Sequence, residues 1–143
     1  TGHVRSFYSV AQHSILCASY APVWLKLSML LHDASEAYLC DVSRPVKHAP
    51  GMEAYCIAES RLQTLVGQRF GVSFDDPLVH EIDNQMLMTE RRDLMNNRHT
   101  WSVTNKPPYS DTIRPMAPEQ AEQAFLETAA RLLPASLGRL VSW

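Results

Sequence analysis

The sequence predicts an all-α fold, and three observations support this class. Apolar residues recur at helical spacing in five segments of the chain. Residues typical of helix starts and ends flank most of these segments. Strand signals are almost absent, because no alternating apolar run is bounded by an Asn-Gly or Asp-Gly turn. With 143 residues, 45% of them hydrophobic, and no repeat or interdomain linker, residues 1–143 are predicted to form one compact bundle of about five main helices.

The first two helices are predicted from their capping residues. Ser9 is a suitable N-cap for a helix over residues 9–20, and Pro22 suits the first turn of the next helix. This second helix is expected to end near Leu39 or Cys40. It is apolar almost all round, so we expect it to be the central, buried helix of the fold.

The remaining three helices are bounded by similar signals. A glycine follows one of them, an Asp-Pro pair starts another, and prolines delimit the last. They are predicted at residues 52–70 before Gly71, at 76–96 from Asp76, and at 118–133 before Pro134. Residues 41–51 and 97–116 are expected to be irregular, because prolines and small polar residues interrupt their periodicity.

Composition excludes several classes of function. The formal net charge is −2, so the chain has no global positive field for a nucleic-acid polymer, although locally placed cations can still bind small phosphate esters. No apolar run approaches the roughly 18 to 20 residues needed to cross a bilayer. The three cysteines include no CxxC pair, which favours reduced thiols and a cytoplasmic protein.

A metal site is predicted from a histidine and an aspartate at the end of the most apolar segment. Burying His32 and Asp33 without a partner would be unfavourable, and a divalent ion binds imidazole and carboxylate together. Glu36 shares their helix face, because it lies three and four residues further on. In a helical bundle the other ligands come from other helices, and His13 and Asp83 are the candidates.

The order His13, His32-Asp33, Asp83 on successive helices resembles the H…HD…D signature of the HD-domain phosphohydrolases. The surrounding words are more specific, namely Ser-Val-Ala-Gln-His-Ser at 9–14, Leu-His-Asp-Ala-Ser-Glu-Ala at 31–37 and Asp-Val-Ser-Arg-Pro-Val-Lys at 41–47. They resemble bacterial 5′-deoxynucleotidases and phage-type HD nucleotide phosphohydrolases, including those that act on deoxyadenosine triphosphate. The likeness spans residues 3–95 and implies a helical HD domain that hydrolyses nucleotides.

The resemblance also implies roles for the site residues. Four ligands, His13, His32, Asp33 and Asp83, would hold one divalent ion such as Mn, Co, Zn or Fe, with Mg as a further option. Glu36 matches the glutamate that orients or deprotonates the attacking water. Asp41 matches an aspartate near the sugar and the leaving group.

The resemblance also implies which basic residues contact the substrate. Lys47 matches a phosphate-binding lysine, and Arg44 and His48 beside it are further candidates. Relatives carry an arginine and an aromatic residue upstream of this chain's start, so we expect an N-terminal segment to be missing, with Arg5 as the candidate substitute. Relatives also form dimers or rings, so we expect a homo-oligomer.

Two alternatives stay open. One is another HD chemistry, such as hydrolysis of a cyclic dinucleotide or an alarmone, and the other is a metal-containing nucleotide-binding module without catalysis. The remaining charged residues are interpreted as surface features. His80 is expected at the surface, and residues 90–93 are interpreted as a salt-bridged, exposed helix face.

Overall fold

The computed structural model describes residues 4–96 and 101–134, and confirms the all-α class. Two isolated residues, Val4 and Met95, form a single β-bridge, and the rest of the regular structure in these ranges is helical. The helices are α1 (Val10–Tyr20), the short 3-10 helix η1 (Val23–Leu25), α2 (Lys26–Leu31), α3 (Glu36–Leu39), α4 (Arg44–Lys47), α5 (Glu53–Phe70), α6 (Pro77–Asp93) and α7 (Pro118–Leu132). Among the described residues, no helix is both long and apolar enough to span a bilayer.

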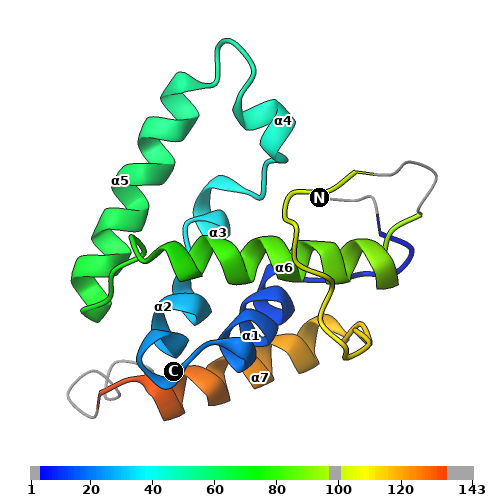
Figure 1. Cartoon of the computed structure of the whole chain (residues 1–143). Helices are drawn as coiled ribbons and strands as arrows, with labels where there is room; N and C mark the ends of the chain where they lie inside the picture. The colour runs from blue at the N-terminus through cyan, green and yellow to red at the C-terminus, as the bar shows by residue number, and fades with distance from the viewer. Residues whose placement is uncertain (1–3, 97–100, 135–143) are drawn as a thin grey trace.

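The central helix is α1, which packs against α2, α6 and α7 (Figure 1). Ser9 caps it as predicted, because its side chain accepts a hydrogen bond from the Gln12 backbone N–H. The expectation that the segment starting at Pro22 would be the central, buried helix is wrong. Trp24 is 77% exposed in η1, and only the middle of that segment, from Leu25 to Leu31, contributes to the core.

The segment from residue 22 to 40 is also not one continuous helix. A turn at residues 32–35 separates α2 from α3, with the Glu36 backbone N–H donating to the Asp33 carbonyl rather than to that of His32. Gln63 on α5 donates its side-chain amide to the carbonyls of Leu31 and His32. Because a side chain satisfies these carbonyls, the helix can end at His32.

The part of the chain that includes α4 and α5 extends from the bundle, and α5 packs mainly against α3 (Figure 1). The predicted loop around Asp41 contains the short helix α4, whose second residue is a proline. Gly71 ends α5 with a positive φ of 67°, as its sequence position predicts. The apolar residues of α5 do not form a buried face, since Ile57 is 52% and Leu65 is 60% exposed.

The irregular segment that follows α6 is fixed to α1 and α6 by side chains. The buried Gln12 donates to the Arg114 carbonyl and accepts from the Met116 N–H. Asp93 accepts from the Ile113 N–H in the same way. Side chains of α1 and α6 therefore pair with three backbone polar groups of residues 113–116, ahead of α7.

A pair of substitutions tests this assignment of core and surface. Met29 is fully buried, so Met29→Ala is expected to lower the free energy of unfolding by about 2–5 kcal/mol. Ile57 is half exposed, and Ile57→Ala is expected to cost less than about 1 kcal/mol. Urea denaturation measures both values, and equal losses would contradict the view that α5 stands outside the core.

Candidate metal centre

Four side chains predicted as metal ligands converge at one point between α1, α2 and α6. The Nε2 atom of His13 lies 3.2 Å from Nε2 of His32 and 3.5 Å from carboxylate oxygens of both Asp33 and Asp83. The Nε2 atom of His32 lies 3.4 Å from the same oxygen of Asp33. Residues up to 70 positions apart in the sequence therefore direct their donor atoms at one small volume.

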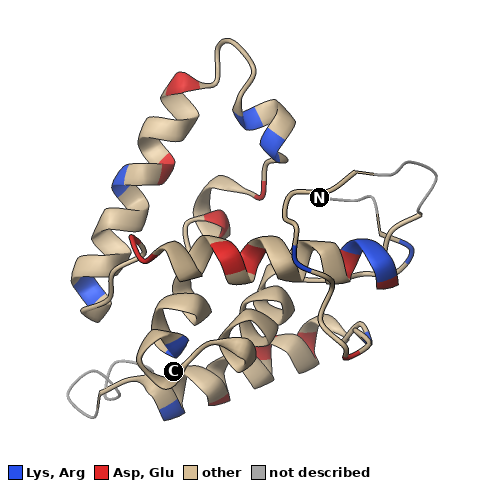
Figure 2. Cartoon of the chain, viewed as in Figure 1, with Lys and Arg blue, Asp and Glu red and all other residues tan. Residues whose placement is uncertain are grey.

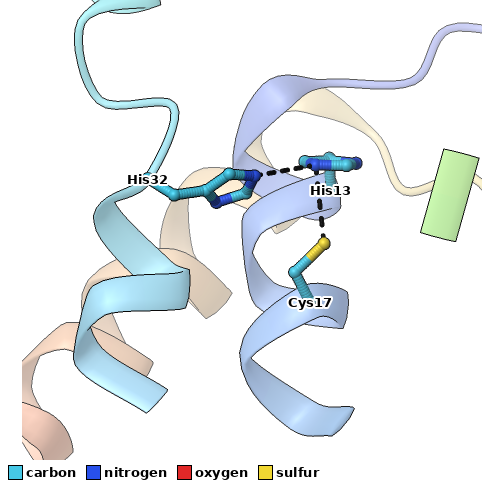
Figure 3. Close-up of side chains that lie close together, drawn as sticks. All are labelled: His13, Cys17 and His32. Carbon is cyan, nitrogen blue, oxygen red and sulfur yellow. Dashed lines mark hydrogen bonds between the residues drawn. The ribbon is translucent and has the colours of Figure 1, made fainter. Parts of the chain in front are cut away.

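The hydrogen bonds of the two imidazoles leave their Nε2 atoms available as ligands. Nδ1 of His13 lies 2.6 Å from a carboxylate oxygen of Glu90, and Nδ1 of His32 lies 2.7 Å from the Met29 carbonyl. Because both partners only accept, each Nδ1 carries a hydrogen, and in the neutral ring each Nε2 has a free lone pair. Figure 3 shows the two rings facing each other through these nitrogens.

The charges around His13 favour a cation at this position. Burial disfavours the protonated ring, but Cys17, Asp83 and Glu90 outweigh burial and raise the pKa of His13 well above its ordinary value. Burial acts against the Asp83 carboxylate too, yet its hydrogen bond to His13 and the charges of His13, His32 and Arg44 lower the pKa of Asp83 to about 2. The groups around His13 therefore favour positive charge at this position.

The spacing of the donor atoms fits a divalent ion. Ligands that lie about 2.1 Å from an ion and subtend 90–110° at it are separated by about 3.0–3.4 Å. The measured distances of 3.2–3.5 Å are close to this range. Donor atoms of His13, Cys17 and His32 also lie within 4.8 Å of one another, so the described residues contain a group able to hold a metal ion.

Glu36 is the first residue of α3, three residues after the predicted ligand Asp33, and its side chain is about 10% exposed. Burial, together with the charges of Asp33 and Asp41, raises the pKa of Glu36 to about 8, while Lys47 acts in the opposite direction. Asp41 is itself exposed, at the start of the segment that leads to α4. The structure thus places Glu36 next to the predicted ligands, in an environment that favours proton binding.

The predicted substrate cations have protein partners in this structure. Arg44 binds the Asp83 oxygen that points away from His13, at 2.6 Å, and also the side chain of Asn84. Lys47 binds Glu59 at 2.6 Å and lies 3.9 Å from Glu36. Arg44 therefore orients a predicted ligand, and a phosphate group would have to share both cations with these partners.

The other two cations predicted to contact substrate, His48 and Arg5, are exposed. His48 is the residue that follows α4. The Arg5 backbone N–H donates to the carbonyl of Leu94, eleven residues beyond Asp83, which is about 16 Å along a helix. None of the described contacts brings the Arg5 guanidinium to the cluster. His80 is exposed, as predicted.

Glu90 was assigned to an exposed, salt-bridged face by the sequence pattern, and this is wrong. It is 7% exposed and accepts hydrogen bonds from His13 and, at 2.8 Å, from the Tyr8 hydroxyl. Burial and the Glu90 charge raise the pKa of Tyr8, so Tyr8 remains a donor. One signal was available in the sequence, because Glu90 lies two helical turns after Asp83 and shares its face.

We expect Glu90→Gln to weaken metal binding about 10- to 100-fold without abolishing it. The amide oxygen can still accept from His13 but carries no negative charge, so the imidazole loses part of its basicity. Calorimetric titration with Mn²⁺ measures the change, and Glu81→Gln on the exposed face of the same helix is the control. Equal affinities of the two variants would exclude this role for Glu90.

A cavity of about 260 Å³ opens beside the cluster. Asp33 and Glu36 lie on one side, and the rest of its wall is mostly apolar and small, with a single aromatic ring. The lining residues are Val10, Ala11, Ser14, Leu30, Asp33, Ala34, Glu36, Ala37 and Phe125. Of the four predicted ligands only Asp33 lines this cavity, so it can hold the apolar part of a ligand whose charged part reaches toward the cluster.

Acidic and basic residues lie in different parts of the molecule around this site. Acidic segments of α3 and α6 lie near the middle of the molecule, and the basic residues of α4 lie further out (Figure 2). The ion pair between Arg44 and Asp83 connects these two regions.

Comparison with known proteins shows the family of the chain. It is 34% identical over 131 residues to the uncharacterized protein YfdR of Escherichia coli (strain K12), and the aligned region covers 88% of this chain and 72% of YfdR. No family model matches the sequence, and no solved structure matches it. On this identity and coverage, the chain belongs to the family of YfdR.

Proposed function

We propose that this protein is a metal-dependent phosphohydrolase of the HD superfamily that acts on nucleoside or deoxynucleoside mono- or triphosphates. The observation that carries the proposal is the convergence of His13, His32, Asp33 and Asp83, with each Nε2 unprotonated in the neutral ring and each Nδ1 held by an acceptor. Two imidazoles and two carboxylates suit Mn²⁺, Co²⁺, Zn²⁺ or Fe²⁺, with Mg²⁺ as a further option. Four ligands leave positions on a six-coordinate ion for water and a phosphate oxygen.

When bound, a divalent ion supplies Lewis-acid chemistry, since it polarises a phosphoryl group and lowers the pKa of a water molecule. The chain's own residues supply the rest. The Glu36 carboxylate would accept the proton of the attacking water, and it must be ionised to do so. Burial and the charge of Asp33 raise the pKa of Glu36, which makes its carboxylate a stronger base. Asp41 is near enough to Glu36 to raise its pKa, and in this proposal it would bind a sugar hydroxyl.

The cavity beside Asp33 and Glu36 supports a nucleotide as substrate. Its apolar wall of alanines, Leu30 and Phe125 suits the uncharged part of the molecule, while the phosphate faces the cluster. Lys47, now bound to Glu59, would contact the phosphate as a point charge.

The three free cysteines are consistent with a reducing, cytoplasmic location.

The test is incubation of the purified chain, in Mn²⁺ or Co²⁺, with a panel of nucleoside mono- and triphosphates, a cyclic dinucleotide and an alarmone. Ion exchange separates the products, and Glu36→Gln is the catalytic control. Orthophosphate from a monophosphate, or tripolyphosphate from a triphosphate, is the expected result. If only the cyclic dinucleotide or the alarmone were cleaved, the substrate would be of that class and not a nucleoside mono- or triphosphate. Metal binding without any turnover would favour a binding module.

Self-association belongs to the same proposal. The exposed apolar side chains of α5, Ile57 and Leu65, are the surface that we expect to be covered. Light scattering on the purified chain measures its mass, and a monomer at micromolar concentration would contradict this part of the proposal.

A further inference from the structure

Cys17 lies at the base of the proposed metal centre, and the four predicted ligands do not account for its position. It is four residues after His13 on α1, so both side chains leave the same face of the helix. Its sulfur lies 3.4 Å from Nε2 of His13, the nitrogen that faces His32 (Figure 3). Cys17 is 0% exposed, whereas Cys40 is exposed and Cys56 only partly buried, so the buried thiol is the one at the cluster.

We propose that Cys17 is a fifth protein ligand of this centre and that it makes the site selective for thiophilic divalent ions, namely Zn²⁺, Co²⁺ or Fe²⁺, over Mg²⁺ and Mn²⁺. The inference rests on the proposed metal centre and adds a ligand to it. On binding, the thiol proton passes to solvent water and a sulfur–metal bond forms in its place.

The distances support coordination by the sulfur. With about 2.3 Å for a metal–sulfur bond and about 2.05 Å for a metal–imidazole bond, ligands at 90–110° to each other are separated by about 3.1–3.6 Å. The observed distance of 3.4 Å lies within this interval. The sulfur is at most 4.8 Å from the ligand nitrogen of His32, a limit that allows the separation of about 4.4 Å expected for ligands on opposite sides of an ion.

The arrangement around His13 gives an independent argument. Its Nε2 atom has four neighbouring donor atoms at 3.2–3.5 Å, one each from Cys17, His32, Asp33 and Asp83. In octahedral coordination every ligand has four neighbours at right angles and one opposite. With Cys17 bound, one of the two positions that the four predicted ligands leave open is filled, so the attacking water and a phosphate oxygen would not both be on the ion.

Ligand chemistry explains the selectivity. Thiolate sulfur is a soft donor, and it favours Zn²⁺ and similar ions, whereas Mg²⁺ and Mn²⁺ favour carboxylate and water oxygens. Without a metal, packing in the apolar core accounts for the burial of Cys17, and a hydrogen bond between its thiol and His13 accounts for the 3.4 Å contact. The two explanations therefore differ in what they predict for a metal-loaded protein.

Cobalt spectroscopy on the full chain tests the proposal. Wild-type protein stripped with chelator and loaded with one equivalent of Co²⁺ is expected to show visible d–d bands and a near-ultraviolet sulfur-to-cobalt charge-transfer band. Cys17→Ser should lose the charge-transfer band and keep the d–d bands, and Cys17→Ala gives a second variant if the serine is poorly tolerated. Cys40→Ser and Cys56→Ser are matched controls and should keep both sets of bands.

Metal affinities provide a second readout. Cys17→Ser is expected to weaken Zn²⁺ binding at least about tenfold and Mn²⁺ binding by less than about threefold. A wild-type spectrum with d–d bands but no charge-transfer band, or a charge-transfer band that survives in Cys17→Ser, would overturn the role of Cys17 and leave the four-ligand centre intact. Failure of the wild type to bind Co²⁺ at all would overturn both.

Discussion

Asp83→Asn is expected to remove most of the stabilisation of this protein by divalent metal ions. The carboxylate contributes an oxygen 3.5 Å from the ligand nitrogen of His13, and the isosteric amide lacks the negative charge. If a binding free energy of about 10–16 kcal/mol is shared among four ligands, each supplies about 3 kcal/mol, or about two orders of magnitude in affinity. We therefore expect at least a 100-fold loss of affinity, to order of magnitude.

Thermal unfolding measures this effect directly. At a metal concentration about 100 times the dissociation constant, binding stabilises the native state by about 2.7 kcal/mol. For a domain of this size that corresponds to an increase of about 5–10 °C in the melting temperature of the wild type. At the same concentration a 100-fold weaker Asp83→Asn should keep at most about 0.4 kcal/mol of this stabilisation, which is an increase of roughly 1 °C. Glu81→Gln, at an exposed residue of the same helix, should behave like the wild type. A full metal-dependent increase in Asp83→Asn would show that the ion binds elsewhere.

Glu36→Gln is expected to lower kcat about 10²- to 10⁴-fold while metal affinity changes by less than about threefold. The amide keeps the shape of the side chain but cannot take a proton from water. Because burial and the neighbouring carboxylates raise the pKa of Glu36, this carboxylate accepts a proton more readily than an exposed one does. Steady-state phosphate release and metal titration measure the two quantities on the same samples.

A second substitution separates catalysis from general effects of removing charge. Glu53 lies at the exposed start of α5, and Glu53→Gln should leave both quantities unchanged. If Glu36→Gln kept the wild-type kcat, another group would have to accept the proton. If it lost metal binding instead, Glu36 would be a ligand and the proposed division of roles would be wrong.

Local signals predicted the helix ends well, because caps depend on one or two residues. Ser9 and Asp76 cap α1 and α6 through their side chains, and Gly71 ends α5 with a positive φ, as expected. The break at residues 32–35 could not be predicted in this way. It depends on Gln63, which is about thirty residues away and pairs with the carbonyls that a continuous helix would have used.

In the site, too, local relationships could be predicted from the sequence and contacts between distant residues could not. Neighbouring positions on one helix, such as His32, Asp33 and Glu36, could be grouped by spacing alone. Arg44 could not be placed, because the sequence does not tell where α4 returns to the bundle. Glu90 could have been grouped with Asp83 by its spacing, but the charges around it also fit an exposed face. Charged residues at helical spacing have the same pattern whether they face solvent or a buried histidine.

The most direct test of the proposed metal centre is a crystal structure of the protein soaked in Mn²⁺, with diffraction data collected at the manganese absorption edge. We predict one strong anomalous peak between α1, α2 and α6, within about 2.0–2.4 Å of donor atoms from His13, His32, Asp33 and Asp83. A peak at any other place, or an ordered cluster with no peak at saturating Mn²⁺, would contradict the proposal.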